Sequence, residues 1–392
     1  MSLPDAIKVF RSTDAGAPSL IGAAGSIIGL LDAVLLNGYN SKAVQSITVA
    51  DGVMTVTTTT AHGMVVGQVL AIAGANESVF NDEFVVQTVP SPVSYTCVAP
   101  VGAPAAATGG SITSKQAALN WEKQFSNTNL ACYRSTDPRS IKPVLSVDNT
   151  FAYWARMRMY ESMNSVSTGV GGDHSAVAGQ AYGVWQSGVA AETTAKPWIV
   201  IGNSRLFYFL PAFNTASPNV RAWYGMGEFR SYKVGDAYNA MFLGNHSAIL
   251  ETYPGSAVAY GNFNPGATTG GSTAILRNMM GTYPSITWGS KGSINCNSAA
   301  AASGAAGSPW PNWAGNVITL FPCQLWEGLG LRGNIPGALF IPVNFGAASN
   351  IPAEQMVVSP ELPGRSIALV TIQSSGNANG LNGFDVTGPW SM

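Results

Sequence analysis

Short apolar and β-branched runs, separated by Gly, Pro, Asn and Ser, make up most of this chain, and long helical periodicity is nearly absent. Such a pattern predicts a mainly β fold. The clearest signal is the pair of runs Ser46–Ala50 and Val53–Thr58, which Asp51-Gly52 separates. Asp-Gly readily adopts the positive φ angles of a tight primed turn, so we expect a β-hairpin here. Further strands are expected at residues 68–73, 83–89, 94–98 and 111–114.

One segment has helical spacing instead. Its apolar residues fall on one broad face, at Ile27, Ile28, Leu31, Val34 and Leu35. This predicts a buried helix from about Ser26 to Asn37, with Gly38 as its stop signal. The longer apolar stretch Ser19–Leu36 is about long enough to span a bilayer, but it contains three glycines and Asp32, so membrane insertion is not expected.

Residues 44–114 differ from their surroundings, because they hold the densest β-branched runs and none of the ten tryptophans. We interpret them as a compact β-module inserted into a β-rich, sandwich-like body that comprises residues 1–43 and 115–392. A further division of the body into two subdomains would fall near residues 215–260. Strands of the body are expected at residues 150–160, 198–201, 205–210, 249–253, 317–321, 338–343 and 366–372.

Two further features concern contacts within and between molecules. The pentapeptide Phe10–Asp14 is closely echoed by Tyr133–Asp137, which is a chance match or marks two adjacent strand ends in one domain. Residues 262–271 and 295–315 are long stretches rich in Gly, Ala, Ser, Asn and Pro. Loops of this length are usually functional, so we expect contacts with other subunits or a receptor there.

Composition favours assembly over an isolated monomer. Charged residues are 10% of the chain, compared with about 25% in an average globular protein, so other subunits are expected to cover part of the surface. The net charge of −1 leaves no excess of basic residues for phosphates, and nucleic acid is not an expected partner. The start of the chain lacks the pattern of a signal peptide, which favours synthesis in a cytoplasm.

Candidate chemistry is sparse, and we assign no catalytic, cofactor-binding or metal-binding residue. Gly328, Gly330 and Gly333 form a G-x-G-x-x-G pattern, but Pro336 follows where a dinucleotide site needs a helix. The sequences starting at Gly202 and Gly271 depart from the nucleophile-elbow pattern. The cysteines form no C-x-x-C pair and are expected to be buried free thiols: Cys97, Cys132, Cys296 and Cys323.

Histidines, carboxylates and tryptophans leave three alternatives to weigh. His62, His174 and His246 have no second ligand at metal spacing and are interpreted as turn or surface residues. A polysaccharide-cleaving enzyme would need two acids in a groove, and no pair stands out among Asp173, Glu228, Asp236, Glu251, Glu327 and Asp385. Eight of the ten tryptophans are candidates for sugar-binding platforms but suit core or interface positions better: Trp185, Trp198, Trp223, Trp288, Trp310, Trp313, Trp326 and Trp390.

Several motifs resemble virion structural proteins of Mu-like and related long-tailed bacteriophages. These motifs are Ala155–Met163, Lys196–Gly202 with Arg205–Tyr208, Gly227–Tyr238, Leu331–Gly337 and Phe384–Trp390. The segment Ser46–Ser114 is similar to a small β-barrel inserted in several phage tail proteins and, at the level of fold, to a domain of ubiquitin-activating enzymes.

This resemblance implies a structural subunit of the tail tip or baseplate, located in the virion and without enzymatic activity or cofactor. It also implies contacts with other tail proteins and a symmetric homo-oligomer, a trimer or a multiple of three. A receptor-binding adhesin that contacts a host cell-surface receptor is the main alternative, and a polysaccharide-degrading tail enzyme is a more distant one.

Overall fold

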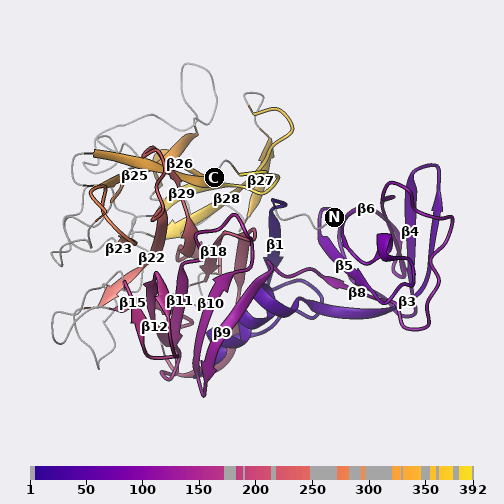
Figure 1. Ribbon diagram of the computed structural model, residues 1–392, viewed down its shortest axis with the longest axis horizontal. Coiled ribbons are helices and arrows are strands. Elements are labelled where there is room, and N and C mark those ends of the chain that lie inside the picture. Colours follow the sequence, from indigo (N-terminus) through magenta and orange to yellow (C-terminus); the bar gives the residue numbers. More distant parts are fainter. Residues whose placement is uncertain are drawn as a thin grey trace.

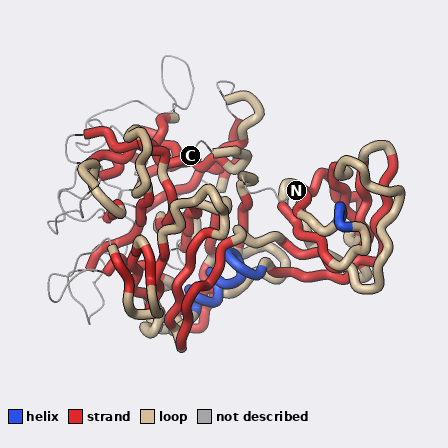
Figure 2. The backbone as a smooth tube through the Cα atoms, in the orientation of Figure 1, coloured by secondary structure: helices blue, strands red, loops and turns tan. Residues whose placement is uncertain are grey.

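The computed structural model describes residues 5–171, 182–188, 190–212, 218–247, 272–281, 293–295, 320–327, 330–345, 354–358, 362–373 and 379–390. These residues form mainly β-strands with few short helices, as the sequence predicts. Figure 1 shows a larger body of stacked sheets, from one side of which a smaller barrel projects. Figure 2 shows how little helix either part contains.

The larger sheet of the body has eleven strands, all paired antiparallel. In spatial order it contains β1 (Lys8–Arg11), β17 (Trp198–Gly202), β18 (Leu206–Pro211), β20 (Tyr224–Glu228), β22 (Ala240–Ser247), β15 (Tyr182–Gln186), β12 (Trp154–Tyr160), β11 (Val144–Asp148), β10 (Leu130–Ser135) and β9 (Trp121–Asn127), while β23 (Ser272–Ile275) also pairs with β22. Strand β1, which precedes the barrel in the sequence, therefore shares a sheet with strands that follow it.

The smaller sheet of the body has eight strands. In spatial order it contains β19 (Val220–Arg221), β28 (Ser366–Gln373), β29 (Asn379–Asp385), β26 (Gly330–Phe345), β25 (Phe321–Glu327) and β24 (Ser293–Asn295), while β21 (Arg230–Ser231) pairs with β26 and β27 (Gln355–Val358) pairs with β28.

The two sheets pack as a sandwich, and strand β18 shows how. Successive side chains of a strand point to opposite faces of its sheet. Tyr208 and Leu210 join the core that faces the smaller sheet, where the Tyr208 ring lies 5.5 Å from that of Phe384. Phe207 and Phe209 belong to a second core on the opposite face. Burial on both faces explains why this strand is an unbroken apolar run.

That second core is enclosed because the larger sheet curls around the predicted helix. The helix consists of α1 (Ser26–Leu31) and a π-helical continuation, η1 (Asp32–Asn37). Trp121 of β9, at one end of the sheet, packs edge-to-face on Phe207 near the other end, with ring centroids 5.3 Å apart. The helix ends at Gly38, which has a φ of 66°. The predicted bounds and stop signal of this helix are confirmed.

The inserted module is a closed barrel with the strand order β3-β4-β7-β6-β5-β8. Phe80 and Tyr95 are fully buried in its interior, in a hydrophobic cluster separate from those of the body. Its first turn confirms the predicted hairpin, because Asp51 and Gly52 both have positive φ angles, 50° and 77°. The barrel elements are β3 (Tyr39–Ala50), β4 (Val53–Thr58), β5 (Val69–Ala73), the short 3-10 helix η2 (Ser78–Phe80), β6 (Glu83–Ser91), β7 (Ser94–Val98) and β8 (Thr113–Gln116).

Short strand pairs complete the described part of the body. They are β2 (Leu20–Gly22) with β16 (Glu192–Lys196), and β13 (Ser162–Met163) with β14 (Gly169–Val170). Within the described residues, no helix is both long and apolar enough to cross a membrane.

Most of the predicted body strands fall on observed ones, with some exceptions. The strand predicted at 249–253, most of the strand predicted at 317–321, the loop at 262–271 and nearly all of the loop at 295–315 lie outside the described residues. The two echoed pentapeptides do end strands, β1 and β10, but these strands are not paired with each other. Both strands belong to the larger sheet of the body, and Phe10 and Tyr133 lie in the same core, so the two pentapeptides end strands of one domain without being direct neighbours.

Candidate functional site at the barrel–body junction

A buried ion pair joins the barrel to the body. Lys8 comes from β1 of the body, and Glu83 begins β6 of the barrel. Lys8 Nζ donates a hydrogen bond to Glu83 Oε1 at 2.6 Å and another to the carbonyl oxygen of Ala118. The two side chains are only 4% and 9% exposed. Burial lowers the pKa of Lys8 below its ordinary value, and Glu83 opposes that shift.

Contacts on either side of this pair restrain the barrel. Gln116 Nε2 donates to the carbonyl oxygen of Val9 at 3.1 Å, so the last barrel strand is bonded to the first body strand. The Tyr39 hydroxyl, at the start of β3, donates to Asp14 Oδ2 at 2.9 Å. Burial raises the pKa of Tyr39. Both chain crossings between barrel and body are thus supported by side-chain hydrogen bonds.

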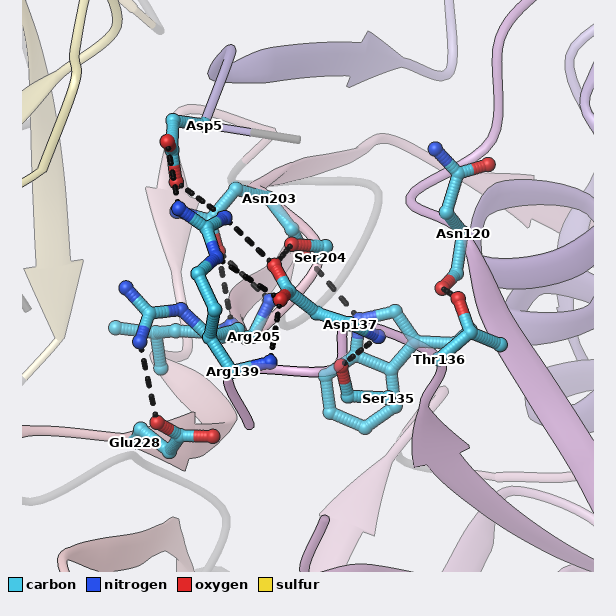
Figure 3. Close-up of polar contacts among 12 residues, drawn as sticks. Asp5, Asn120, Ser135, Thr136, Asp137, Arg139, Asn203, Ser204, Arg205 and Glu228 are labelled. Carbon is cyan, nitrogen blue, oxygen red and sulfur yellow. Dashed lines mark hydrogen bonds and ion pairs between the residues drawn. The ribbon is translucent and has the colours of Figure 1, made fainter. Parts of the chain in front are cut away.

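Asn120 extends the junction into the body (Figure 3). Its Nδ2 donates to Glu83 Oε1 at 3.1 Å, and its carbonyl oxygen accepts hydrogen bonds from the backbone N–H and the hydroxyl of Thr136. Asn120 has a φ of 61°, a left-handed conformation that Asn tolerates better than most residues. A continuous path of polar contacts therefore runs from the barrel to the end of β10.

Asp137 is the centre of this path in the body. It accepts hydrogen bonds from Ser204 Oγ at 2.7 Å and from Arg139 through the backbone N–H at 2.9 Å, Nε at 3.0 Å and Nη2 at 2.8 Å. Arg139 also binds Asp5, with Nη1–Oδ2 and Nη2–Oδ1 distances of 3.0 and 2.8 Å (Figure 3). The hydrogen bonds from Arg139 hold the pKa of Asp137 well below its usual range.

Glu228 closes the network on the other side of the β17–β18 turn. It is 2% exposed, accepts the backbone N–H of Ile141 at 3.0 Å and lies 3.5 Å from Arg205 Nη1. Burial raises the pKa of its carboxyl group, because the nearby arginine only partly offsets the loss of solvation. The β10–β11 loop, the β17–β18 turn and the end of β20 are thus linked by charged groups.

In this network a serine hydroxyl meets a carboxylate at the contact between Ser204 and Asp137. The Ser204 hydroxyl donates a hydrogen bond to Asp137. The lowered pKa of Asp137 makes this carboxylate a weak proton acceptor, so the contact does not activate the serine as a nucleophile. Within the part of the chain that the structure describes, no three His, Cys, Asp or Glu side chains converge as a metal site would require.

Of the three histidines, His62 lies in the segment between strands β4 and β5, as expected of a turn residue, and it is buried at 1% exposure rather than exposed at the surface. Its Nδ1 accepts the backbone N–H of Met64 at 2.9 Å, and its ring packs edge-to-face on Tyr95. His174 and the side chain of His246 lie outside what the structure describes.

Of the candidate acids, the structure brings Asp236 and Glu327 together at one arginine, Arg332. Each of the four described acids has an arginine partner: Glu228 has Arg205, Asp236 and Glu327 share Arg332, and Asp385 has Arg365. Asp173 and Glu251 are outside the described residues.

The other sequence candidates have structural positions. Trp185, Trp198, Trp223 and Trp390 are buried, Trp326 is half-buried, and Trp288, Trp310 and Trp313 are outside the described residues. Gly330 and Gly333 lie within strand β26 rather than before a helix. Cys97, Cys132 and Cys323 are buried free thiols as expected, and burial raises the pKa of Cys97 to about 12 and that of Cys132 to about 11. Cys296 is outside the described residues.

Comparison of the chain with models of known protein families and with curated protein sequences gave no match.

Sequence reasoning did not identify Lys8, Glu83 or Asn120, because their partners are far away in the sequence. A signal existed only for Asp137, the last residue of the second echoed pentapeptide. Asp14, its counterpart in the first pentapeptide, has different partners and accepts the backbone N–H of Arg11 and the hydroxyl of Tyr39.

Proposed function

We propose that this chain is a structural subunit of a bacteriophage tail tip or baseplate. In this proposal it assembles with other tail proteins as a homo-oligomer, a trimer or a multiple of three, and presents a surface for host attachment. The motifs that resemble virion proteins of long-tailed phages supply the assignment to the virion. The observation that carries the mechanical role is the buried Lys8–Glu83 ion pair, which fixes the projecting barrel to the body.

The character of the junction supports a mechanical function. Loose linkers suit modules that search for partners, whereas a subunit that transmits position needs its parts fixed to one another. Here two chain crossings, an ion pair and the hydrogen bond from Gln116 to Val9 fix the barrel. Lys8 Nζ, Gln116 Nε2 and Asn120 Nδ2 all donate hydrogen bonds at the junction, which supports a role in holding the barrel in position.

Immunogold labelling of intact virions with antibody against this chain tests the proposal. Label at the tail tip is expected, whereas label on the head, along the tube or nowhere on the virion would contradict it. Fab fragments should then be tested for inhibition of adsorption, since they reduce the steric hindrance of a whole antibody.

Two further assays separate the alternatives. A subunit that presents its attachment surface only in the assembled tail should bind other tail proteins but not host cells by itself, so binding of the purified chain to isolated host cells or pili would favour a receptor-binding adhesin. Release of reducing sugar from host surface polysaccharide would favour a tail enzyme.

A further inference from the structure

The outer end of the barrel carries an apolar patch with one negative charge. Val53 and Val98 are cross-strand partners on β4 and β7, and their side chains are 45% and 66% exposed. Val101, in the turn after β7, is fully exposed. Asp51 lies in the β3–β4 turn, and the backbone N–H of Ala99 bonds to Gly52 at 2.9 Å, which brings these segments together. We call Asp51, Val53, Val98 and Val101 the barrel tip.

A second apolar patch, with a positive charge, lies on the body. Tyr232 and Val234, in the loop after β21, are exposed, as is Met280 in the turn after β23. Lys233 connects the two segments, because its Nζ donates to the carbonyl oxygen of Met279 at 2.8 Å. We call Tyr232, Lys233, Val234 and Met280 the body patch. Contiguous exposed apolar groups of this kind mark protein contact sites.

The charges of the two parts are complementary. The barrel, residues 39–116, holds four of the 20 acidic residues and two of the 19 Lys and Arg, so it has a formal charge of −2 and the rest of the chain +1. Among the described residues, neither Asp51 nor Lys233 forms an ion pair. Two barrels would repel each other, whereas a barrel and a body attract.

The two patches lie too far apart to meet within one molecule. Strand β23, which precedes Met279 by a short turn, lies at the end of the longest axis opposite the barrel (Figure 1). Contact between the patches therefore requires two copies of the chain. A contact between different surfaces of identical subunits is head-to-tail, and it closes into a ring when the rotation between subunits permits.

We propose that the barrel tip of one copy docks on the body patch of the next copy. The valines supply the apolar contact, and Asp51 of one copy faces Lys233 of the other. This inference builds on the proposed function by naming the contact between copies. Its test uses the purified full chain, so absence of the chain from virions would contradict the proposed function without affecting this measurement.

The test is light scattering combined with size-exclusion chromatography at rising protein concentration. We expect species larger than the 40.7 kDa monomer. Val98→Ser with Val101→Ser should weaken association at least about tenfold, because buried apolar anchors dominate interfaces. The matched control is Val65→Ser with Val66→Ser, which changes two other exposed barrel valines and should associate like the unchanged chain. Thermal unfolding of each variant checks that it folds.

Charge exchange tests the pairing itself. Lys233→Glu should weaken association, and Asp51→Lys in the same chain should restore it, whereas Lys42→Glu at the body end of β3 should have no effect. In an equal mixture of the two single variants, contacts between unlike copies pair opposite charges, so association should recover in part, although a ring of three would keep one like-charged contact. A chain that stays monomeric at every concentration, or assembly that the tip variant or Lys233→Glu leaves unchanged, would overturn the proposal.

Discussion

Asp137 and Glu228 show how two carboxylates in one network acquire opposite properties. Asp137 accepts several hydrogen bonds from Arg139 and Ser204, which favour its charged form. Glu228 is buried with a more distant arginine, and burial favours its neutral form. Their contributions to stability should therefore depend on pH with opposite signs.

Replacement of Asp137 by Asn should lower the free energy of unfolding by about 1–3 kcal/mol at neutral pH, because Arg139 and Ser204 lose a charged acceptor. The folded-state pKa of Asp137 is depressed, so its stabilisation is present above the unfolded value of about 3.9 and is lost as pH falls below it. Urea denaturation of both proteins at pH 7 and pH 3 should show the difference shrinking. A difference that grew toward pH 3 would contradict this account.

Replacement of Glu228 by Gln should have the opposite pH dependence. The folded-state pKa of Glu228 is raised, so its contribution is most favourable below the unfolded value of about 4.3 and declines as pH rises through the folded value. Gln resembles the protonated acid, so the variant should match the unchanged protein near pH 4 and be at least as stable at pH 7. Urea denaturation of both proteins from pH 4 to pH 7 measures the difference in unfolding free energy. A variant that becomes less stable than the unchanged protein as pH rises would refute the prediction.

At the scale of elements, what the sequence revealed was local. The β3–β4 hairpin follows from Asp51-Gly52, and the buried helix follows from its apolar spacing and Gly38, so both were predicted with nearly correct bounds. The pairing of β1 with β17 and the curl that places Trp121 on Phe207 join distant parts of the chain. Neither strand pattern nor composition specifies such partners, which is why the junction could not be predicted.

Gly38 connects the helix to the barrel at a place where no side chain fits. Its φ of 66° and ψ of −179° are favourable only for glycine, and an added Cβ would lie 2.1 Å from the carbonyl oxygen of Gln116. Gly38→Ala should therefore cost clearly more than the roughly 1–3 kcal/mol of backbone strain alone. Gly102→Ala is the control, since its φ is 78° but nothing lies within 4 Å of the added atom. Equal losses in denaturant unfolding would show that the contact with Gln116 is unimportant.

At the scale of the whole molecule, barrel and body have separate hydrophobic cores. Phe80 belongs to the barrel core and Phe207 to the body core, and both are fully buried. Replacement of either by Ala should cost about 3–5 kcal/mol in its own part. Calorimetry should then show two unfolding transitions. Phe80→Ala should lower the midpoint temperature of the barrel transition, and Phe207→Ala that of the body transition. Equal shifts of a single transition in both variants would indicate one cooperative unit instead.

Coupling between the two cores should depend on the Lys8–Glu83 pair. Lys8→Met leaves the Glu83 carboxylate buried with Asn120 as its remaining side-chain donor, and removal of one partner from a buried pair costs about 3–5 kcal/mol. Because Lys8 belongs to the body and Glu83 to the barrel, we expect the midpoint temperatures of both unfolding transitions to decrease. Replacing both residues by Met should recover most of the loss, since neither side chain then carries a buried charge. A shift of the body transition alone would mean that the ion pair serves the body and does not hold the barrel in place.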